Sequence, residues 1–434
     1  MYGFIKTKNF RSIMRLWSTV INSPEKKILL SNFLSLGVVQ GLNFILPLLV
    51  VPYLLYTLGI ELFGLLAMAT ALSSYFMILS DYGFNVTATR EISVYRDNPK
   101  KLNEIFSAVM MIKIILMSIG FLILLLSLWF FESLAKDAPI YLLTFGMVLG
   151  EVLFPIWFFQ GVEKMKYIAI LNIVAKFFFL FAIFLFVNAK EDIYLVPLFN
   201  SLGFIAVGLI SLFYLYKRFN IRFVWQPYKV LRHYFIMGWH IFLSKLAVTL
   251  YSSSNIFVLG VFTNHLLVGY YAVAYKVVSA LVSLGDIINQ VLFPYLSRKW
   301  EENRATYYKI FKKVLQGMIA TMFLLSLILF LSAEEIVTLL AGENISITVE
   351  LLQIMSLFLV IAPLGGLYSQ SFVTQGHSLY VTKSTFWTLF VNMILIAILI
   401  PLYGVYGLAV AEVLVKIFHF YLNNLYFTHL RKVT

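Results

Sequence analysis

Long hydrophobic segments separated by short polar connectors run along almost the whole chain. About 20 apolar residues cross a bilayer as a helix, so each segment of that length predicts one membrane span. A polar backbone inside hydrocarbon must bond internally, so the spans are expected to be α-helical. The pattern predicts about twelve spans, at roughly 32–57, 62–80, 104–131, 140–160, 167–188, 193–215, 235–262, 266–295, 311–332, 347–372, 384–402 and 407–428.

The longest basic connector, residues 216–234, divides the predicted spans into two sets of six. It gives four expected parts: a basic amphipathic N-terminal arm (1–31), an N-lobe (32–215), the inter-lobe linker (216–234) and a C-lobe (235–434). Of the 434 residues, 61% are hydrophobic and only 12% are charged. Soluble domains carry about 25% charged residues, so the composition also indicates an all-α integral membrane protein.

Positive charge lies almost entirely on one side of the predicted topology. If the N-terminus is cytoplasmic, 26 of the 33 Lys and Arg residues fall on the cytoplasmic side, and only Lys136 and Lys190 fall in outer connectors. Such a bias orients membrane proteins with the positive side inside. We therefore expect a multi-pass membrane protein with both termini cytoplasmic. The net charge of +13 reflects this topology rather than nucleic-acid binding.

The two halves of the chain resemble each other weakly. A shift of 205 residues places Gly64, Ala67, Ala69, Ser74 and Asp81 on Gly269, Ala272, Ala274, Ser279 and Asp286. A shift of 215 places Leu149, Gly150, Gln160 and Gly161 on Leu364, Gly365, Gln375 and Gly376. Because both halves start on the same side, the pattern predicts a parallel repeat about an axis along the membrane normal.

Most catalytic chemistries have no support in the sequence. The chain has no cysteine, and its six histidines show no paired spacing, so neither a metal site nor a bound cofactor is expected. It contains no GxxxxGK[ST], GxSxG or HExxH motif. The outer connectors are too short for a catalytic domain, which argues against a membrane-embedded polysaccharide polymerase or ligase. The pattern favours a transporter over an enzyme.

Charged and amide side chains inside the predicted spans are the candidates for function, since each intramembrane charge is costly. Lys245 and Lys276 fall near the membrane midplane on consecutive spans, which predicts a cationic cavity for an anionic substrate. The alternative is that they pair with Asp286 or extend to the membrane surface. Four further residues are cavity candidates: Lys113 and Lys176, and the amides Asn43 and Asn255, which either bind sugar hydroxyls or join helices.

Carboxylates supply candidates for gating, coupling or structure. Asp81 and Arg90 lie at the expected cytoplasmic mouth as either a gate pair or a fixed clamp, with Asp286 as the repeat counterpart of Asp81. Glu151 is the lone carboxylate of its span and either carries a proton or pairs with a nearby lysine. Glu412 and Lys416 have the spacing of a helical ion pair, so a structural role is expected for them.

Two stretches carry a family resemblance: PYLLYTLGIELFGLLAMATALSSYFMILSDYGFNVTATREIS at 52–93 and PIWFFQGVEKMKY at 155–167. They resemble the Wzx-type flippases of O-antigen and polysaccharide repeat units. These flippases belong to the multidrug/oligosaccharidyl-lipid/polysaccharide exporter superfamily. The resemblance implies a V-shaped pair of six-helix lobes that works by alternating access. It also implies that the first, second, seventh and eighth spans line the central cavity, which places Asn43, Lys245 and Lys276 there.

The resemblance further implies a location in a bacterial inner membrane, a substrate and partners. The substrate would be an undecaprenyl-diphosphate-linked oligosaccharide, moved from the cytoplasmic to the periplasmic leaflet, with the lipid bilayer around its tail. A polysaccharide polymerase, a chain-length regulator and a coupling ion are further expected partners. A drug/cation antiporter of the same superfamily is the alternative, and it would need an acidic cavity rather than a lysine-lined one.

Overall fold

The computed structural model describes residues 48–252 and 254–433, and all regular elements in this part of the chain are helical. The candidate site Asn43 and the predicted arm 1–31 lie outside the described residues. A helix at Leu48–Leu58 opens the described part. It is followed by α3 (Ile60–Asp81), α4 (Phe84–Val94), α5 (Pro99–Phe130), α6 (Glu132–Ala135), α7 (Ala138–Leu153), α8 (Ile156–Gly161), α9 (Met165–Phe186), the 3-10 turn η1 (Lys190–Tyr194), α10 (Leu195–Phe219), α11 (Tyr228–Ser252), α12 (Ser254–Phe262), α13 (His265–Glu302), α14 (Arg304–Leu331), α15 (Ala333–Ala341), α16 (Ser346–Thr374) and α17 (Leu379–Val433).

Within the described residues, nine helices are long and apolar enough to cross a membrane, or ten if α11 and α12 form one bent span. Helix α17 is in fact two helices joined at Gly404, whose backbone leaves the helical region with φ 57° and ψ −130°. The helix Leu48–Leu58 coincides with the end of the first predicted span. The all-helical membrane fold is therefore confirmed. The count of twelve stays a prediction, because residues 32–47 are not described.

Local sequence signals set the ends of several helices. Asn98, Asn264 and Asn303 each precede a helix, and each side chain accepts a hydrogen bond from a backbone N–H in the first turn. Asparagine is a favoured residue at this position because its side chain satisfies one of the first helical N–H groups, which have no acceptor within the helix. These three caps start α5, α13 and α14.

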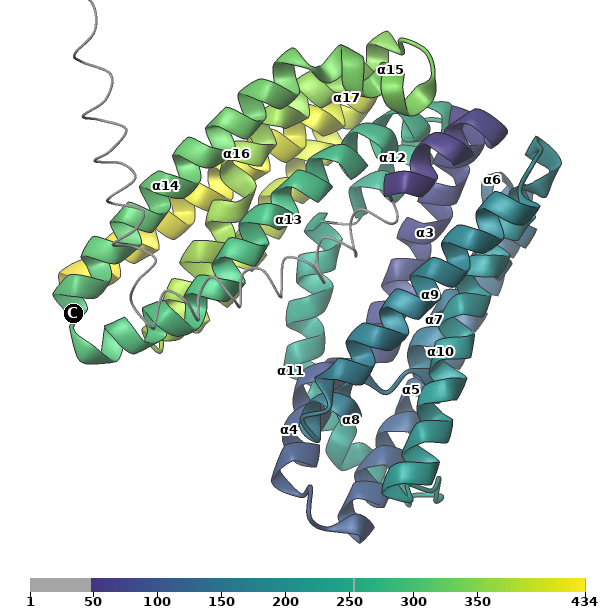
Figure 1. The fold of residues 1–434 in the computed structure, drawn as a ribbon, viewed down its shortest axis with the longest axis vertical. Coiled ribbons are helices and arrows are strands. Elements are labelled where there is room, and N and C mark those ends of the chain that lie inside the picture. The colour runs from purple at the N-terminus through teal and green to yellow at the C-terminus, as the bar shows by residue number, and fades with distance from the viewer. Residues whose placement is uncertain (1–47, 253, 434) are drawn as a thin grey trace, which may run out of the picture.

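The helices form two groups that meet at one end and diverge toward the other (Figure 1). The first group, here called the N-lobe, comprises α3 to α10; the second, the C-lobe, comprises α13 to α17. We call the end where they meet the closed end and the opposite end the open end. Helices α3 and α13 begin at the closed end, at Ile60 and His265. The charge pattern predicts that this end faces outward.

Backbone contact between the lobes occurs at Gly64 of α3 and Gly269 of α13. A Cβ atom built on Gly64 would lie 2.6 Å from the backbone nitrogen of Gly269, and one on Gly269 would overlap the carbonyl oxygen of Ile60. Only glycine permits this approach, as in other close helix crossings in membranes. Gly64 and Gly269 are also equivalent under the shift of 205 residues. Contact between equivalent residues is what a two-fold repeat axis between α3 and α13 would produce.

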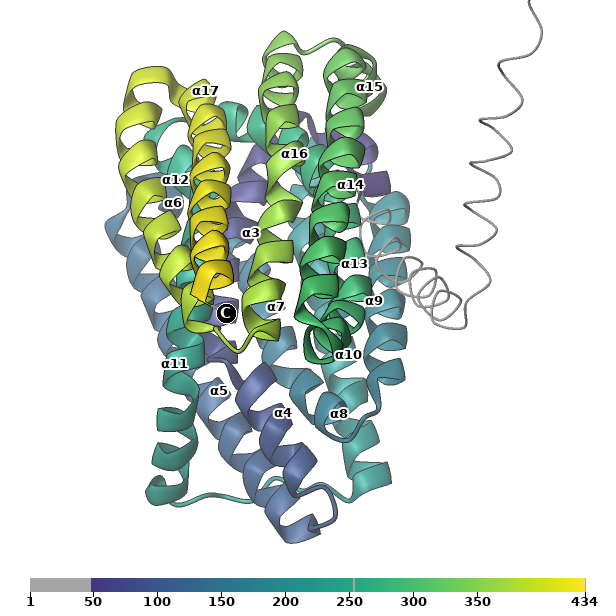
Figure 2. The same cartoon turned by 90° about the vertical axis from the view of Figure 1, so that its left-hand side faces the viewer.

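Helices α11 and α12 connect the two lobes, with a bend of 50° between them (Figure 2). The first half of α11 packs on the N-lobe, where Tyr82 lies between the rings of Phe235 and Phe242 at centroid distances of 4.5 and 4.9 Å. Helix α12 packs against α17 of the C-lobe and against α3. The expected boundary between linker and C-lobe at 234 thus falls inside α11, a helix that contacts both lobes.

The non-helical part of the inter-lobe connector lies along α5. The backbone N–H of Arg222 donates to the side chain of Asn103 at 2.6 Å, and that of Val224 donates to Ser107 Oγ at 2.9 Å. These contacts hold the connector on the N-lobe and position the start of α11 there.

Candidate functional site

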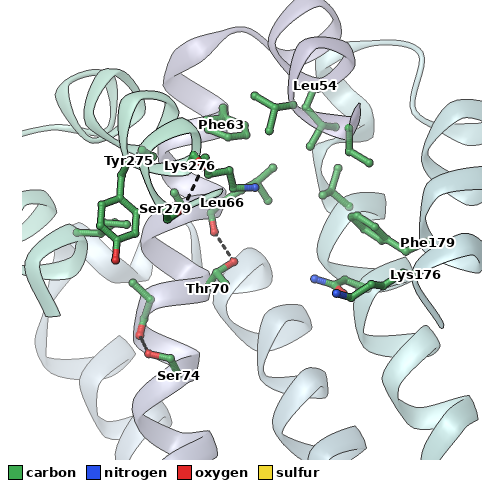
Figure 3. A pocket seen from close by; sticks show the side chains of 18 of the residues that line it. Leu54, Phe63, Leu66, Thr70, Ser74, Lys176, Phe179, Tyr275, Lys276 and Ser279 are labelled. Carbon is green, nitrogen blue, oxygen red and sulfur yellow. Dashed lines mark hydrogen bonds between the residues drawn. The ribbon is translucent and has the colours of Figure 1, made fainter. Parts of the chain in front are cut away.

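A cavity of about 490 Å³ lies between the lobes and is the first candidate site. Helices α3, α9 and α10 line it on the N-lobe side, α13 lines it on the C-lobe side, and residues 50–54 close it above. Figure 3 shows the side chain of Lys176 on one wall and that of Lys276 on the other. The cavity thus receives one ammonium group from each lobe.

The remaining lining of this cavity, here called the deep cavity, is apolar with a few neutral polar groups. Thr70, Ser74, Asn172, Asn200 and Ser279 supply hydroxyls and amides, and the lining residues that the structure describes include no carboxylate. Lys276 Nζ lies 5.3 Å from the centroid of the Phe63 ring, a distance at which a cation interacts favourably with the ring face. Two ammonium groups in a mostly apolar cavity favour occupation by an anion.

One face of α3 leads from the deep cavity to a second one at the open end. Phe63, Leu66, Thr70 and Ser74 line the deep cavity, and Met77 and Asp81 line the second, each three or four residues beyond the last. This spacing keeps all of them on one helix face. The second cavity, here called the mouth cavity, has a volume of about 440 Å³ and is also lined by Asn85, Glu151, Ser244, Lys245 and Thr249.

Four charged side chains from four helices meet beside the mouth cavity. Lys245 Nζ donates to Asp81 Oδ2 at 2.5 Å, and Lys113 Nζ donates to Glu151 Oε1 at 3.0 Å. Ser80 Oγ also donates to Glu151 Oε2, at 3.1 Å. The Lys113 side chain is fully buried, and that of Glu151 is 13% exposed. Buried charges are tolerated when paired in this way, and they are costly to separate.

The predicted pairing of Asp81 with Arg90 is wrong. Asp81 is paired with Lys245 of α11, and Arg90 is exposed on α4. The reason is the break between α3 and α4, where Tyr82 and Gly83 take left-handed backbone angles of φ 47° and 80°. Glycine adopts such a conformation easily, and the turn gives α4 a new direction. Nearness in sequence therefore did not bring the two charges together.

Two of the four lysines proposed for one cavity, Lys245 and Lys113, lie elsewhere. Lys176 and Lys276 line the deep cavity, whereas Lys245 lines the mouth cavity. Lys113 lies inside the N-lobe in its ion pair with Glu151, which was the alternative considered for that carboxylate. Asp286 is exposed on α13, so its surroundings differ from those of its repeat counterpart Asp81, which is buried.

A second buried polar cluster lies inside the C-lobe. Asn255 Nδ2 donates to Glu412 Oε1 at 2.6 Å, and Asn392 Nδ2 donates to Asn255 Oδ1 at 3.3 Å. Asn255 therefore joins helices, and its predicted place in the substrate cavity is wrong. Lys416 lies over the rings of Tyr251 and Phe358, with Nζ 4.8 and 5.3 Å from their centroids.

The expected ion pair of Glu412 with Lys416 takes another form, because each side chain has other neighbours. Glu412 accepts its hydrogen bond from Asn255, and Lys416 makes cation–π contacts. A spacing of four residues places two side chains on one helix face but leaves their rotamers free. Aromatic rings from α11 and α16 then attract the ammonium group. No periodicity in the sequence signals these rings.

The fold and the two cavities define a class of protein: a multi-pass, all-helical membrane protein with cavities between two groups of helices. Two solved structures of membrane proteins share this fold. A multidrug resistance transporter of the MATE family in the MOP superfamily, in an inward-facing conformation, superposes with a TM-score of 0.69 at 12% identity, covering 89% of this chain and 99% of that one. The lipid II flippase MurJ, in an inward closed conformation, gives 0.74 at 15% identity, covering 90% and 87%.

The sequence comparisons show the family. Residues 29–300 match the family described as polysaccharide biosynthesis protein, and the chain belongs to it. A relative from Escherichia coli (strain K12), described as an O-antigen transporter, is 31% identical over 389 residues, which cover 89% of this chain and 94% of the relative. A relative from Shigella dysenteriae with the same description is 25% identical over 392 residues, covering 89% and 98%. The expected membrane transporter of the Wzx type is thus confirmed, and the enzyme alternative is not supported.

Proposed function

We propose that this protein is a flippase that moves an undecaprenyl-diphosphate-linked oligosaccharide from the cytoplasmic to the periplasmic leaflet by alternating access. The observation that carries the proposal is the pair of lysines in the deep cavity, one on each lobe. A diphosphate offers several anionic oxygens and can bind two ammonium groups at once. Charge-assisted hydrogen bonds of this kind are the stronger ones in proteins.

The deep cavity also suits the rest of such a substrate. Hydroxyl and amide groups of Thr70, Ser74, Asn172 and Asn200 can bond the hydroxyls of sugars near the diphosphate. The polyprenyl tail needs no polar site, because it stays in the hydrocarbon of the bilayer. A cavity of about 490 Å³ holds the diphosphate and the first sugars. The remaining sugars of a repeat unit extend into the space between the diverging lobes.

The position of the contact between the lobes supports alternating access. With Gly64 against Gly269 the closed end is sealed, and the mouth cavity lies at the other end of the same face of α3. Rocking the lobes about this region would close the open end and release the substrate on the opposite side. The chain has no ATP-binding motif, so the movement relies on an ion gradient or on removal of the product.

The alternative, a drug/cation antiporter, fits the described cavity less well. A cationic drug needs a carboxylate or an aromatic cage, and the described lining of the deep cavity presents two ammonium groups instead. The names of the two sequence relatives also support a glycan substrate over a drug.

A flipping assay in proteoliposomes tests the proposal. Purified protein is reconstituted with a fluorescent undecaprenyl-diphosphate oligosaccharide, and the fraction exposed in each leaflet is followed by quenching. We expect flipping by the wild type and its loss in Lys176→Gln/Lys276→Gln. The exposed Lys312→Gln on α14 is the control for loss of positive charge. In cells, deletion of the gene should leave lipid-linked repeat units facing the cytoplasm. Normal polymerisation in the deletion strain would contradict the proposal.

A further inference from the structure

The mouth cavity contains an internal ion pair whose two members differ in burial. The side chain of Asp81 is 8% exposed and that of Lys245 is 34% exposed. Oxygen Oδ2 of Asp81 accepts from Lys245, while the other oxygen, Oδ1, is buried without a hydrogen-bond partner. Asp81 is therefore an incompletely satisfied carboxylate held at the edge of a cavity of about 440 Å³.

Charges beside the mouth cavity balance only while Lys245 is in place. Asp81 and Glu151 contribute two negative charges, and Lys113 and Lys245 contribute two positive charges. Lys113 is fully buried against Glu151, whereas Lys245 reaches the cavity on a long side chain that is partly solvent-exposed. Lys245 is thus the member of the cluster that can change partner without unpacking a helix.

We propose that Lys245 forms an entry site for the substrate diphosphate, and that the Asp81 carboxylate occupies this site in the diphosphate's absence. The carboxylate and the phosphate compete for the same ammonium group, so Asp81 acts as a built-in competitor of the substrate. This inference rests on the proposed function, since it takes the same diphosphate as ligand. It adds a second site, at the open end, from which the shared face of α3 leads to the deep cavity.

The neutral polar groups around Lys245 fit this role. Asn85, Ser244 and Thr249 line the mouth cavity beside it and can donate hydrogen bonds to phosphate oxygens. Helix α3 places Ser74 of the deep cavity seven residues before Asp81, or about 10 Å along the axis at 1.5 Å per residue. A diphosphate with its sugars can pass between cavities this close without leaving the protein.

Binding at Lys245 has a consequence for Asp81. Once its ammonium partner bonds the phosphate, Asp81 is a buried carboxylate beside Glu151, with Lys113 as the single remaining cation of the cluster. An unpaired buried charge costs several kcal/mol. The two carboxylates of the cluster therefore take up one proton from bulk water: one O–H bond forms, and the cluster is neutral again.

Other ionisable groups near Asp81 do not offer a substitute partner. On α4, Arg90 is exposed, and Glu91 is negatively charged, so it cannot replace an ammonium group. On α11, His240 is exposed. The carboxylate cluster therefore takes up one proton when the diphosphate binds, and by linkage this binding becomes tighter as the pH falls.

Isothermal titration calorimetry of the full-length protein tests this inference. Undecaprenyl diphosphate is titrated in detergent at pH 7.5 in two buffers with different ionisation enthalpies, and the difference in heat gives the protons taken up. We expect uptake of about one proton per bound diphosphate by the wild type, since one carboxylate loses its ammonium partner. Asp81→Asn should bind more tightly and take up no proton. Lys245→Gln should bind more weakly, again without proton uptake.

Glu302→Gln is the matched control, because exposed Glu302 accepts from Lys299 at 2.6 Å outside both cavities. It should retain the wild-type affinity and proton uptake. Binding by the wild type without proton uptake would overturn the inference, as would unchanged uptake in Asp81→Asn. Either result leaves the flippase proposal standing. Absence of binding by a folded wild type would instead contradict the flippase proposal itself. If Asp81→Asn does not fold, Lys245→Gln serves as the second variant, because it too should bind without proton uptake.

Discussion

Gly64 and Gly269 touch through their backbones, and this contact seals one end of the protein. The two residues occupy equivalent positions in the two halves of the sequence, and neither has room for a side chain. The internal repeat thus places two glycines where α3 crosses α13, and their close approach holds that end closed. It leads to the first of four predictions.

Adding a methyl group at this contact should separate the closed end. Gly64→Ala or Gly269→Ala places a Cβ against backbone atoms that cannot move as a flexible side chain could. We expect the lobes to tilt so that their open ends come together. The sequence has no cysteine, so spin labels at Lys166→Cys and Lys313→Cys can report this distance between the lobes. Pulsed electron paramagnetic resonance should show a population with a shorter distance.

Gly317→Ala on α14 is the control for this experiment. Nothing lies within 4 Å of a Cβ built there, so the change should leave the distance unaltered. Alanine should even stabilise the helix by up to about 1 kcal/mol. A distance distribution in Gly269→Ala identical to that of the wild type would contradict the proposed role of the contact.

The buried pair of Lys113 and Glu151 should make a large contribution to stability that appears only when one partner is removed. We expect Lys113→Met or Glu151→Leu to destabilise the protein by about 3–5 kcal/mol, since each leaves a buried charge unpaired. The double variant Lys113→Met/Glu151→Leu should recover most of this loss. Thermal unfolding in detergent, followed by intrinsic fluorescence, gives the comparison. Additive losses in the double variant would mean that the pair is not isolated in this way.

Charge reversal distinguishes the observed partner of Asp81 from the one expected from sequence. Asp81→Lys alone brings two ammonium groups together and should lower transport. Exchange of both charges, in Asp81→Lys/Lys245→Asp, should restore part of the activity because the pair is rebuilt. The corresponding exchange with Arg90, Asp81→Arg/Arg90→Asp, should restore none. Flipping in proteoliposomes measures all three, and recovery through Arg90 alone would contradict the observed pairing.

The two lysines of the deep cavity should act on one ligand. Lys176→Gln and Lys276→Gln each remove a charge-assisted hydrogen bond, worth about 1.5–3 kcal/mol. Each should therefore weaken the binding of undecaprenyl diphosphate by roughly tenfold to a hundredfold. Because both contact the same diphosphate, their effects should not add. A double-mutant cycle of binding affinities is the measurement, and strict additivity would indicate two independent sites.

Several features could be predicted from the sequence because they depend on local composition. Long apolar segments can satisfy their backbone in a membrane only as helices, so the all-helical fold and the approximate position of each span followed directly. The caps at Asn98, Asn264 and Asn303 are equally local. The match of Gly64 with Gly269 was visible as a repeat, although its meaning as a lobe contact was not.

The site was predicted less completely, because the distribution of charges between cavities depends on how helices rotate and pack. Lys176 and Lys276 do line one cavity. Lys245 was assigned to the same cavity, but the fold places it in the mouth cavity, against Asp81. Asn255 was expected either to bind sugar hydroxyls or to join helices, and its burial against Glu412 became apparent only with α17 in position.

The stretch that includes Asp81 and Arg90 shows which features the sequence determined and which the tertiary structure determined. Sequence alone determined that this is the end of a membrane helix and that charges gather beside the membrane. Tertiary structure alone decided which charge neutralises Asp81. A left-handed turn at Tyr82 and Gly83 redirects the chain that carries Arg90, and α11 brings Lys245 from 164 residues away. Hydropathy depends on each residue, but an ion pair depends on the three-dimensional path of the backbone between its members.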